Sequence, residues 1–142
     1  MEELREKKID LSEDARAELN VLLDALREIL QMTLAAFVAN DAEAAATVEP
    51  LERVVDKLKT ELRDRHITRL KENRCSVEAG FVWSDLLTDL ERVSDHCSNI
   101  ALGVMDASAH NMNAHQAHRE IKKDSELYRE RLVYYSNKYL LP

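Results

Sequence analysis

The sequence predicts an all-α protein: an antiparallel three-helix bundle of spectrin-repeat-like shape, extended by one additional C-terminal helix. Two observations carry this prediction. The 142 residues include only 2 Gly and 2 Pro, the residues that usually mark hairpins and loops. Apolar residues also recur at alternating steps of three and four over three long segments, which is the period of amphipathic helices. A chain of this length is expected to form one domain with its own apolar core.

The first helix is expected to follow Ser12, a suitable N-cap that precedes two acidic residues, and to end near "AND" at 39–41. Asp41 can cap the second helix, and Ser76 can cap the third. The apolar stripes expected in the core are Leu19, Leu22, Leu26, Ile29 or Leu30, and Phe37 in the first helix; Val48, Leu51, Val55, Leu58 and Leu62 in the second; and Trp83, Leu86, Leu90, Val93, Cys97, Ile100 and Val104 in the third.

The chain is expected to divide into three parts. Residues 1–11 read as a linker or N-terminal extension, and residues 12–109 as the bundle. Residues 110–142 contain a loop and a polar, Tyr-bearing helix that packs on the bundle or extends it. The pattern does not determine where this last helix docks.

Composition and charge exclude several functional classes. The net charge of −7 argues against a nucleic-acid partner, because neutralising phosphates requires a basic face. No apolar run is long enough to span a membrane. The charged opening "MEELREKKID" is unlike a signal peptide, so we expect a cytoplasmic, reduced chain.

The same acidic step, two acidic residues four positions apart, occurs in two successive helices. Glu52 and Asp56 lie four residues apart in the second helix, as do Glu91 and Asp95 in the third. The apolar pattern of the third helix turns Glu91 and Asp95 away from the core, so both steps could meet at one open surface. Crowded carboxylates favour a divalent or trivalent cation with oxygen ligands, such as magnesium, calcium, manganese or iron. The competing interpretation is an ordinary solvated face, since the chain has 27 acidic residues.

The sequence around these acidic residues resembles that of a known family. "EPLERVVDKL" at 49–58 and "ERVSDHCSNIA" at 91–101 are similar to the signature of PhoU-type phosphate regulators, three-helix bundles in which an acid-x-x-x-Asp step recurs on successive helices. The resemblance covers about residues 8–140. It is strongest to the PhoU-like domain at the C-terminus of bacterial sodium/phosphate cotransporters, which follows a membrane part and often ends in a Tyr-rich helix.

This resemblance implies iron or zinc clusters on the outer surface of the bundle. Carried over by position, the ligands are Glu52, Asp56, Glu91 and Asp95. The family often has Gly where this chain has Ser94, and free-standing members usually hold two tandem bundles where this chain has room for one. A single set of motifs is therefore expected to bind metal weakly, or as a homodimer.

A basic segment ends the second helix. Its candidate anion or lipid contacts are Arg63, Arg65, Arg69 and Lys71. Cations at a helix C-terminus also complement the helix dipole, which is the simpler explanation. A phosphate or an anionic lipid is the functional alternative, suited to a domain held beneath a membrane.

Two residues of the third helix carry structural expectations. Gly80 lies in its first turns, where Gly costs about 1 kcal/mol relative to Ala, so we expect another helix to approach closely there. Cys97 lies in the apolar stripe and is expected to be a buried, inert thiol.

Catalysis is not expected. The chain lacks a Gly-rich phosphate loop, a nucleophile elbow and a His-Glu-x-x-His pattern, and its candidate acids differ from the core ligands of ferritin-like enzymes. The resemblance implies a cytoplasmic regulatory domain tethered at the inner face of the membrane, whose partner is the membrane domain of a sodium-dependent phosphate cotransporter. A free-standing PhoU-like regulator and a metal-binding helical bundle stay open as alternatives, as does whether Met1 is a natural start.

Overall fold

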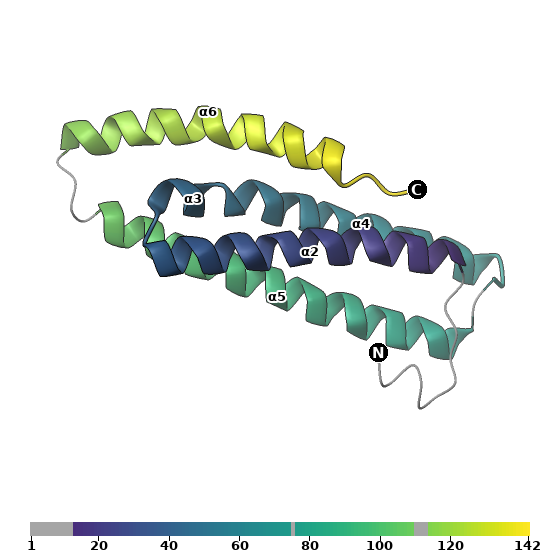
Figure 1. The fold of residues 1–142 in the computed structure, drawn as a ribbon. Coiled ribbons are helices and arrows are strands. Elements are labelled where there is room, and N and C mark those ends of the chain that lie inside the picture. Colours follow the sequence, from purple (N-terminus) through teal and green to yellow (C-terminus); the bar gives the residue numbers. More distant parts are fainter. Residues whose placement is uncertain (1–12, 75, 110–113) are drawn as a thin grey trace.

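The computed structural model describes residues 13–74, 76–109 and 114–142. Expectations for the N-terminal extension, for Ser12 and for most of the loop before the last helix lie outside the described residues. The described chain forms α2 (Glu13–Ala39), α3 (Ala42–Ala46), α4 (Val48–Lys71), α5 (Val77–Ala109) and α6 (Ala114–Lys138), as Figure 1 shows. These ranges contain no strand, and the predicted all-α fold is confirmed.

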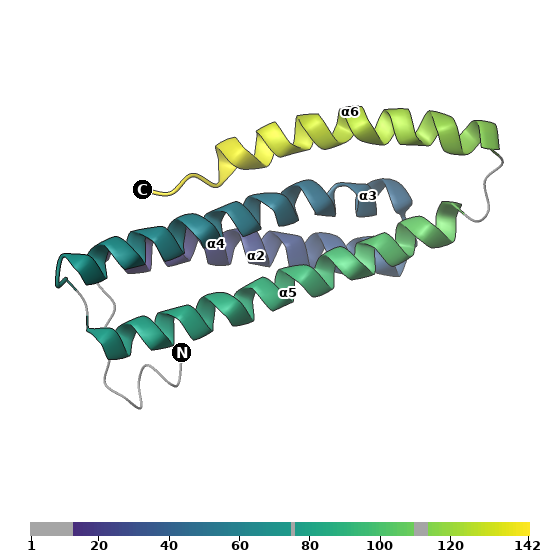
Figure 2. The ribbon, with the colours of Figure 1, turned by 180° about the vertical axis from the view of Figure 1, so that it is seen from behind.

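The three-helix bundle consists of α2, α4 and α5. Each of these helices runs antiparallel to the one before it and contacts the other two (Figures 1 and 2). The last helix, α6, lies outside this bundle and runs along α3 and α4. Within the described residues, no helix is both long and apolar enough to cross a membrane.

Two asparagines end the first two long helices. Asn40 has φ 52° and Asn73 has φ 56°, the left-handed conformation that Asn tolerates better than most residues. The backbone N–H of the residue after each one donates to a carbonyl in the last turn of the helix, at 3.0 Å for Asp41 to Ala36 and 2.8 Å for Arg74 to Arg69. These bonds turn the chain back on itself and produce the antiparallel order.

The predicted second helix is divided in two. Asp41 caps the short α3 by accepting hydrogen bonds from the backbone N–H groups of Glu43 and Ala44, at 3.1 and 3.2 Å. The hydroxyl of Thr47 donates to the carbonyl of Ala44 at 2.6 Å, at the point where α3 ends. Pro50 has no N–H to continue the ladder and is tolerated in the first turn of a helix, so a new helix, α4, begins at Val48.

The core lies along the shared axis of α2, α4 and α5. Leu19, Leu22, Leu26 and Ile29 of α2 are buried as expected, as are Val48, Leu51, Val55, Leu58 and Leu62 of α4. Phe37 was expected in the core and is 63% exposed, because the last turns of α2 bury Thr33 and Ala36 instead. That part of the prediction was wrong.

The buried face of α5 is turned from the predicted one. Trp83, Cys97 and Val104 are buried as expected, but Ile100 is 45% exposed, so its assignment to the core was wrong. Leu86, Leu90 and Val93 are only half-buried, and Leu87, Ser94 and Ala101 occupy the centre instead. Hydrophobicity predicted the largest side chains inside, whereas the narrow space between α2 and α4 also accommodates the small Ser and Ala side chains. The Cys97 thiol is buried, and this burial raises its pKa.

Contacts from the last turns of α6 show how this helix, whose docking the sequence left open, packs on the bundle. Tyr135 is buried, and its hydroxyl contacts Met32 Sδ at 3.4 Å. The carboxylate of Glu28 accepts hydrogen bonds from Lys138 Nζ at 2.6 Å and from the Tyr139 hydroxyl. Burial alone would raise the pKa of Glu28, but these two bonds hold it below its usual value. Burial and the bond to Glu28 raise the pKa of Tyr139 to about 12.

The expected close approach at Gly80 is confirmed. A Cβ at this position would lie 2.8 Å from His66 Nε2 of α4 and 3.5 Å from Leu70 Cδ1. The buried His66 ring cannot move outward easily because it also lies beside Trp83, with the ring centroids 6.1 Å apart. Burial, with the nearby Arg69 charge, lowers the pKa of His66, which favours its neutral form.

Gly80→Ala is expected to lower the free energy of unfolding by about 1–3 kcal/mol, because the added methyl overpacks the contact with His66. Gly103→Ala is the matched control in the same helix. No described atom lies within 4 Å of its added Cβ, so helix propensity should raise stability by up to about 1 kcal/mol. Denaturant unfolding of the dilute chain, followed by circular dichroism, measures both. Equal effects of the two substitutions would contradict the close approach.

Candidate functional site: the acidic face of α4 and α5

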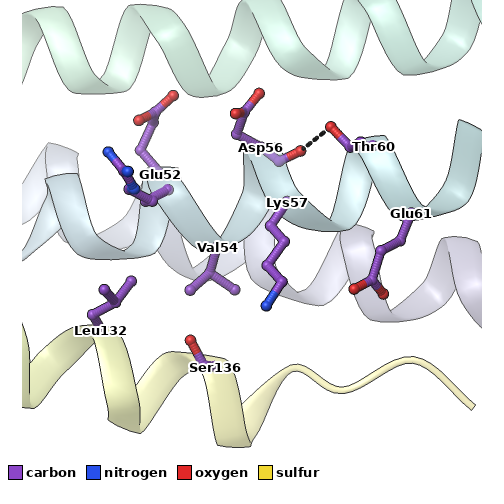
Figure 3. A pocket seen from close by; sticks show the side chains of 9 residues that line it. Glu52, Val54, Asp56, Lys57, Thr60, Glu61, Leu132 and Ser136 are labelled. Atoms are coloured by element: carbon purple, nitrogen blue, oxygen red, sulfur yellow. Dashed lines mark hydrogen bonds between the residues drawn. The ribbon is translucent and has the colours of Figure 1, made fainter.

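The repeated acids lie along the border between α4 and α5. Glu52 is half-buried and Asp56 exposed on α4, and Figure 3 shows both carboxylates pointing toward the α5 side. On α5, Asp95 is exposed, as the sequence predicted, but Glu91 is half-buried. Glu91 does not point away from the bundle because the buried face of α5 is centred on Leu87 and Ser94, which turns it toward α4.

The raised pKa of Glu52 identifies the acidic residues that lie close to it. Burial, followed by the charges of Asp56, Asp95 and Glu49, raises the pKa of Glu52 above its ordinary value. Three of the four predicted site residues therefore share one electrostatic environment. Like charges at such spacings repel, so a nearby positive charge stabilises this face.

Lys59 supplies that positive charge from within the chain. Its Nζ lies 2.5 Å from Glu91 Oε1 and 3.2 Å from Asp56 Oδ1, and its side chain is only 10% exposed. Burial alone would lower the pKa of Lys59, but its bonds to Glu91 and Asp56 raise it. One ammonium group thus pairs with the second acid of the α4 step and the first acid of the α5 step.

Sequence reasoning missed Lys59. A signal was present, because Lys59 follows Asp56 by three residues, a spacing at which opposite charges meet on a helix. It also directly follows Leu58 of the buried stripe, which places it at the edge of the core.

The metal assignment stays a prediction. Among the described residues, no group of three or more His, Cys, Asp or Glu side chains could hold a metal ion in the observed arrangement. The Lys59 ammonium lies between two of the predicted ligands, Asp56 and Glu91, where a cation would otherwise bind. Glu52, Asp56, Glu91 and Asp95 supply the oxygen donors that a hard cation prefers, but the ion would have to displace Lys59.

A groove of about 720 Å³ lies between α4 and α6, and Glu52 and Asp56 are among the residues that line it. Figure 3 shows Val54 and Lys57 pointing toward α6 there, while Glu52 and Asp56 point the opposite way. Its charged lining mixes Arg53 and Lys57 with Glu52, Asp56 and Glu61, so it does not select one sign of ligand.

The basic segment at the end of α4 is divided between buried and exposed residues. Arg69 is buried and donates from Nη1 to both carboxylate oxygens of the buried Glu18, at 3.3 and 3.2 Å. Arg65 donates to Glu18 at 3.2 Å and to the backbone oxygen of Pro142 at 2.8 Å. Arg63 and Lys71 are exposed. An anion or lipid could reach these two directly, whereas Arg69 is already engaged by Glu18.

The Glu18 pair fastens α2 to α4 near the end where α5 begins. The Arg69 guanidinium lies 5.9 Å from the centroid of the Trp83 ring of α5. The positive charge of Arg69, on α4, therefore contacts side chains of both α2 and α5. Arg69 Nη2 and Trp83 Nε1 are buried donors without a hydrogen-bond partner among the described residues. Removing one partner of a buried pair leaves an uncompensated charge, so this contact is expected to be sensitive to mutation.

Comparison with known proteins finds a protein family that this chain matches. A family model described as the PhoU domain matches residues 19–104, which is more than half of the chain. Among curated proteins, the chain is similar to the phosphate-specific transport system accessory protein PhoU homolog 1 of Thermotoga maritima, at 29% identity over 83 residues. The alignment covers 58% of this chain and 36% of that protein, so the chain spans about a third of this relative's length. No solved structure matches it significantly.

The close spacing of these carboxylates predicts that the free energy of unfolding depends on pH. Because the folded pKa of Glu52 is raised, its ionised form destabilises the fold at neutral pH, and this cost disappears as the pH falls below the unfolded pKa. Glu52→Gln should therefore raise the free energy of unfolding at pH 7 by about 0.2–0.5 kcal/mol, with a smaller gain at pH 4. Denaturant unfolding across this range measures it, with the exposed Glu61→Gln of the same helix as control. A loss of stability at pH 7 would contradict the repulsion.

Proposed function

The chain belongs to the PhoU domain family, and from this premise we propose that it regulates phosphate transport and performs no catalysis. The observation that carries the proposal is the family match over residues 19–104, which includes both acidic steps. The printed name of the Thermotoga maritima relative, an accessory protein of a phosphate-specific transport system, supports the same role.

In its specific form, the proposal is a cytoplasmic regulatory domain of a sodium-dependent phosphate cotransporter, held at the inner face of the membrane by the transporter's membrane domain. It is supported by the sequence of residues 49–101 and by the Tyr-rich segment in the last helix. The structure adds a physical basis for the latter: Tyr135 and Tyr139 are buried against the bundle, so a Tyr-rich end is a packing element of the domain.

The mechanism is indirect. Glu52, Asp56, Glu91 and Asp95 would hold a cation or a basic partner helix, which would supply the balancing charge in place of Lys59. Because Lys59 joins α4 to α5, its release changes the contact between these two helices. That change alters how the bundle docks on the membrane domain, and thereby modulates phosphate uptake.

Fractionation of the native host tests the specific form. An antibody against the domain is expected to detect a membrane-bound protein several times heavier than 16.3 kDa. In-frame removal of the segment encoding the domain should then change sodium-dependent uptake of radiolabelled phosphate while leaving the amount of transporter unchanged. A band near 16.3 kDa outside the membrane fraction would instead favour the free-standing regulator.

The metal-binding form of the proposal has its own test. Glu91→Gln with Asp95→Asn should abolish bound iron, zinc or manganese, measured by elemental analysis after dialysis, while the helical signal stays intact. Lys59→Met should strengthen cation binding by about tenfold or more, since it removes the competing charge from two carboxylates.

Lys57→Met is the matched control, because Lys57 is exposed and points toward α6. It removes the same charge from the same helix and should leave cation binding nearly unchanged. Bound metal that survives the double substitution, or an equal effect of the two lysines, would refute the site.

A further inference from the structure

We propose that the end of the bundle where α4 ends and α5 begins binds an acidic amphipathic helix of a partner protein. The surface, which we call the turn patch, consists of exposed residues from the last turns of α4 and the first turns of α5: Arg63, Ile67, Lys71, Val77 and Phe81. It lies apart from the acidic face and carries the opposite charge. The inference therefore goes beyond the proposed function and does not depend on it.

Three large apolar side chains are exposed in the turn patch. Phe81 is 70% exposed, Val77 66% and Ile67 43%. Val77 and Phe81 are four residues apart, about one helical turn, so they share a side of α5. An exposed aromatic ring beside aliphatic side chains is typical of protein interfaces, where aromatic residues are enriched.

Ile67 and Phe81 lie on the same side of the contact between α4 and α5. At this contact, His66 Nε2 lies 2.8 Å from where a Cβ of Gly80 would be. Ile67 follows His66 and Phe81 follows Gly80, and each step along a helix turns the next side chain by about 100°. Because α4 and α5 are antiparallel, both turns lead to the same outer side of the contact (Figures 1 and 2).

Helical periodicity places the turn patch on the same border of α4 and α5 as the acidic face. Arg63 follows Asp56 by seven residues, which is close to two turns, and Phe81 precedes Asp95 by fourteen, which is close to four. This border is therefore acidic along one part, and basic and apolar at the end where α5 begins.

Two cations of the turn patch lack a counter-ion. Arg63 and Lys71 lie one turn before and one turn after Ile67, and both are exposed. Neither forms an ion pair within the part of the chain that the structure describes, whereas Arg65 and Arg69 of the same helix end both pair with a carboxylate. An apolar helix face flanked by carboxylates would complement this arrangement in shape and in charge.

The surroundings of the turn patch favour a protein segment over a lipid surface. Asp64, Glu72, Glu78 and Asp85 are exposed on or beside the same turns, and the whole chain has a net charge of −7. An extended anionic membrane would meet these carboxylates together with the two cations and would be repelled by them. A single helix can contact the turn patch alone, so it is the occupant with the better charge complementarity.

The turn patch rests on closely packed side chains. Directly beneath it, the buried Trp83 ring lies 6.1 Å from the His66 ring and 5.9 Å from the Arg69 guanidinium, measured to the Trp83 centroid. Arg69 is in turn held by Glu18 of α2. A surface that is already fixed in place loses little conformational entropy when a partner binds.

Selection from a peptide library tests the chemistry of the partner. Random helical peptides of about four turns, displayed on phage, are selected against the immobilised full chain. The expected peptides carry Asp or Glu on both sides of a stripe of Leu or Phe. A library that yields no such peptide overturns the proposal. Peptides that are only basic would do so while supporting the acidic face, so the two proposals fail separately.

Fluorescence anisotropy then measures the affinity of a selected acidic peptide for variants of the chain. Phe81→Ser should weaken binding about tenfold or more, because it removes the aromatic anchor. Arg63→Gln with Lys71→Gln should weaken it about threefold or more and reduce its dependence on salt. The matched controls are Val133→Ser and Lys57→Gln, exposed residues outside the turn patch that should leave the affinity unchanged. Circular dichroism checks that all variants stay folded.

Vesicle flotation separates a protein partner from a lipid one. The chain is expected not to float with vesicles of phosphatidylcholine, with or without phosphatidylglycerol. Binding to the anionic vesicles that is lost in Phe81→Ser overturns the proposal in favour of a lipid contact. An acidic peptide that binds Phe81→Ser as tightly as the unchanged chain overturns it as well.

Discussion

The ammonium group of Lys59 makes the acidic face compatible with a folded bundle. Two helices that each present an acid-x-x-x-Asp step to one border would repel each other along it. Lys59 bonds to one acid of each step, at 3.2 Å for Asp56 and 2.5 Å for Glu91, and so converts that repulsion into a link between α4 and α5. At the end of the bundle where α5 begins, Arg69 and the buried Glu18 link α4 to α2. A positive charge on α4 thus holds each of its two neighbours.

Much of the fold could be predicted from the sequence, because helix periodicity and turn residues are local signals. The positions of the long helices followed from Asp41, Ser76 and the apolar stripes of α2 and α4. The failures have tertiary causes. Ser94 and Ala101 lie at the centre of α5 because of the space between its neighbours, which no hydrophobic pattern of α5 alone encodes. The division at Thr47 needed the combined effects of a hydroxyl bond and Pro50.

The candidate site was only partly predictable for a related reason. The sequence around Glu52 and Asp95 identified the acidic residues. The raised pKa of Glu52 shows that the charges of Asp56 and Asp95 lie near it. Lys59 was overlooked because a lysine in an acidic helix resembles ordinary surface charge until its burial is known. The same holds for Arg69, whose sequence context suggested an external anion while its partner, Glu18, lies far away in the chain.

The attachment of α6 through its final turns has a consequence for the order of folding. The bundle helices pair with their neighbours in sequence, so short loop closures can assemble them quickly. The bonds from Lys138 and Tyr139 to Glu28 instead join residues more than a hundred positions apart, and they form only after α2 has found its place. The segment should therefore dock last and open first, as a local unit of lower stability than the bundle helices. Hydrogen exchange would then be faster along α6 than in the core helices, and the apolar surface beneath Tyr135 would be exposed transiently without global unfolding.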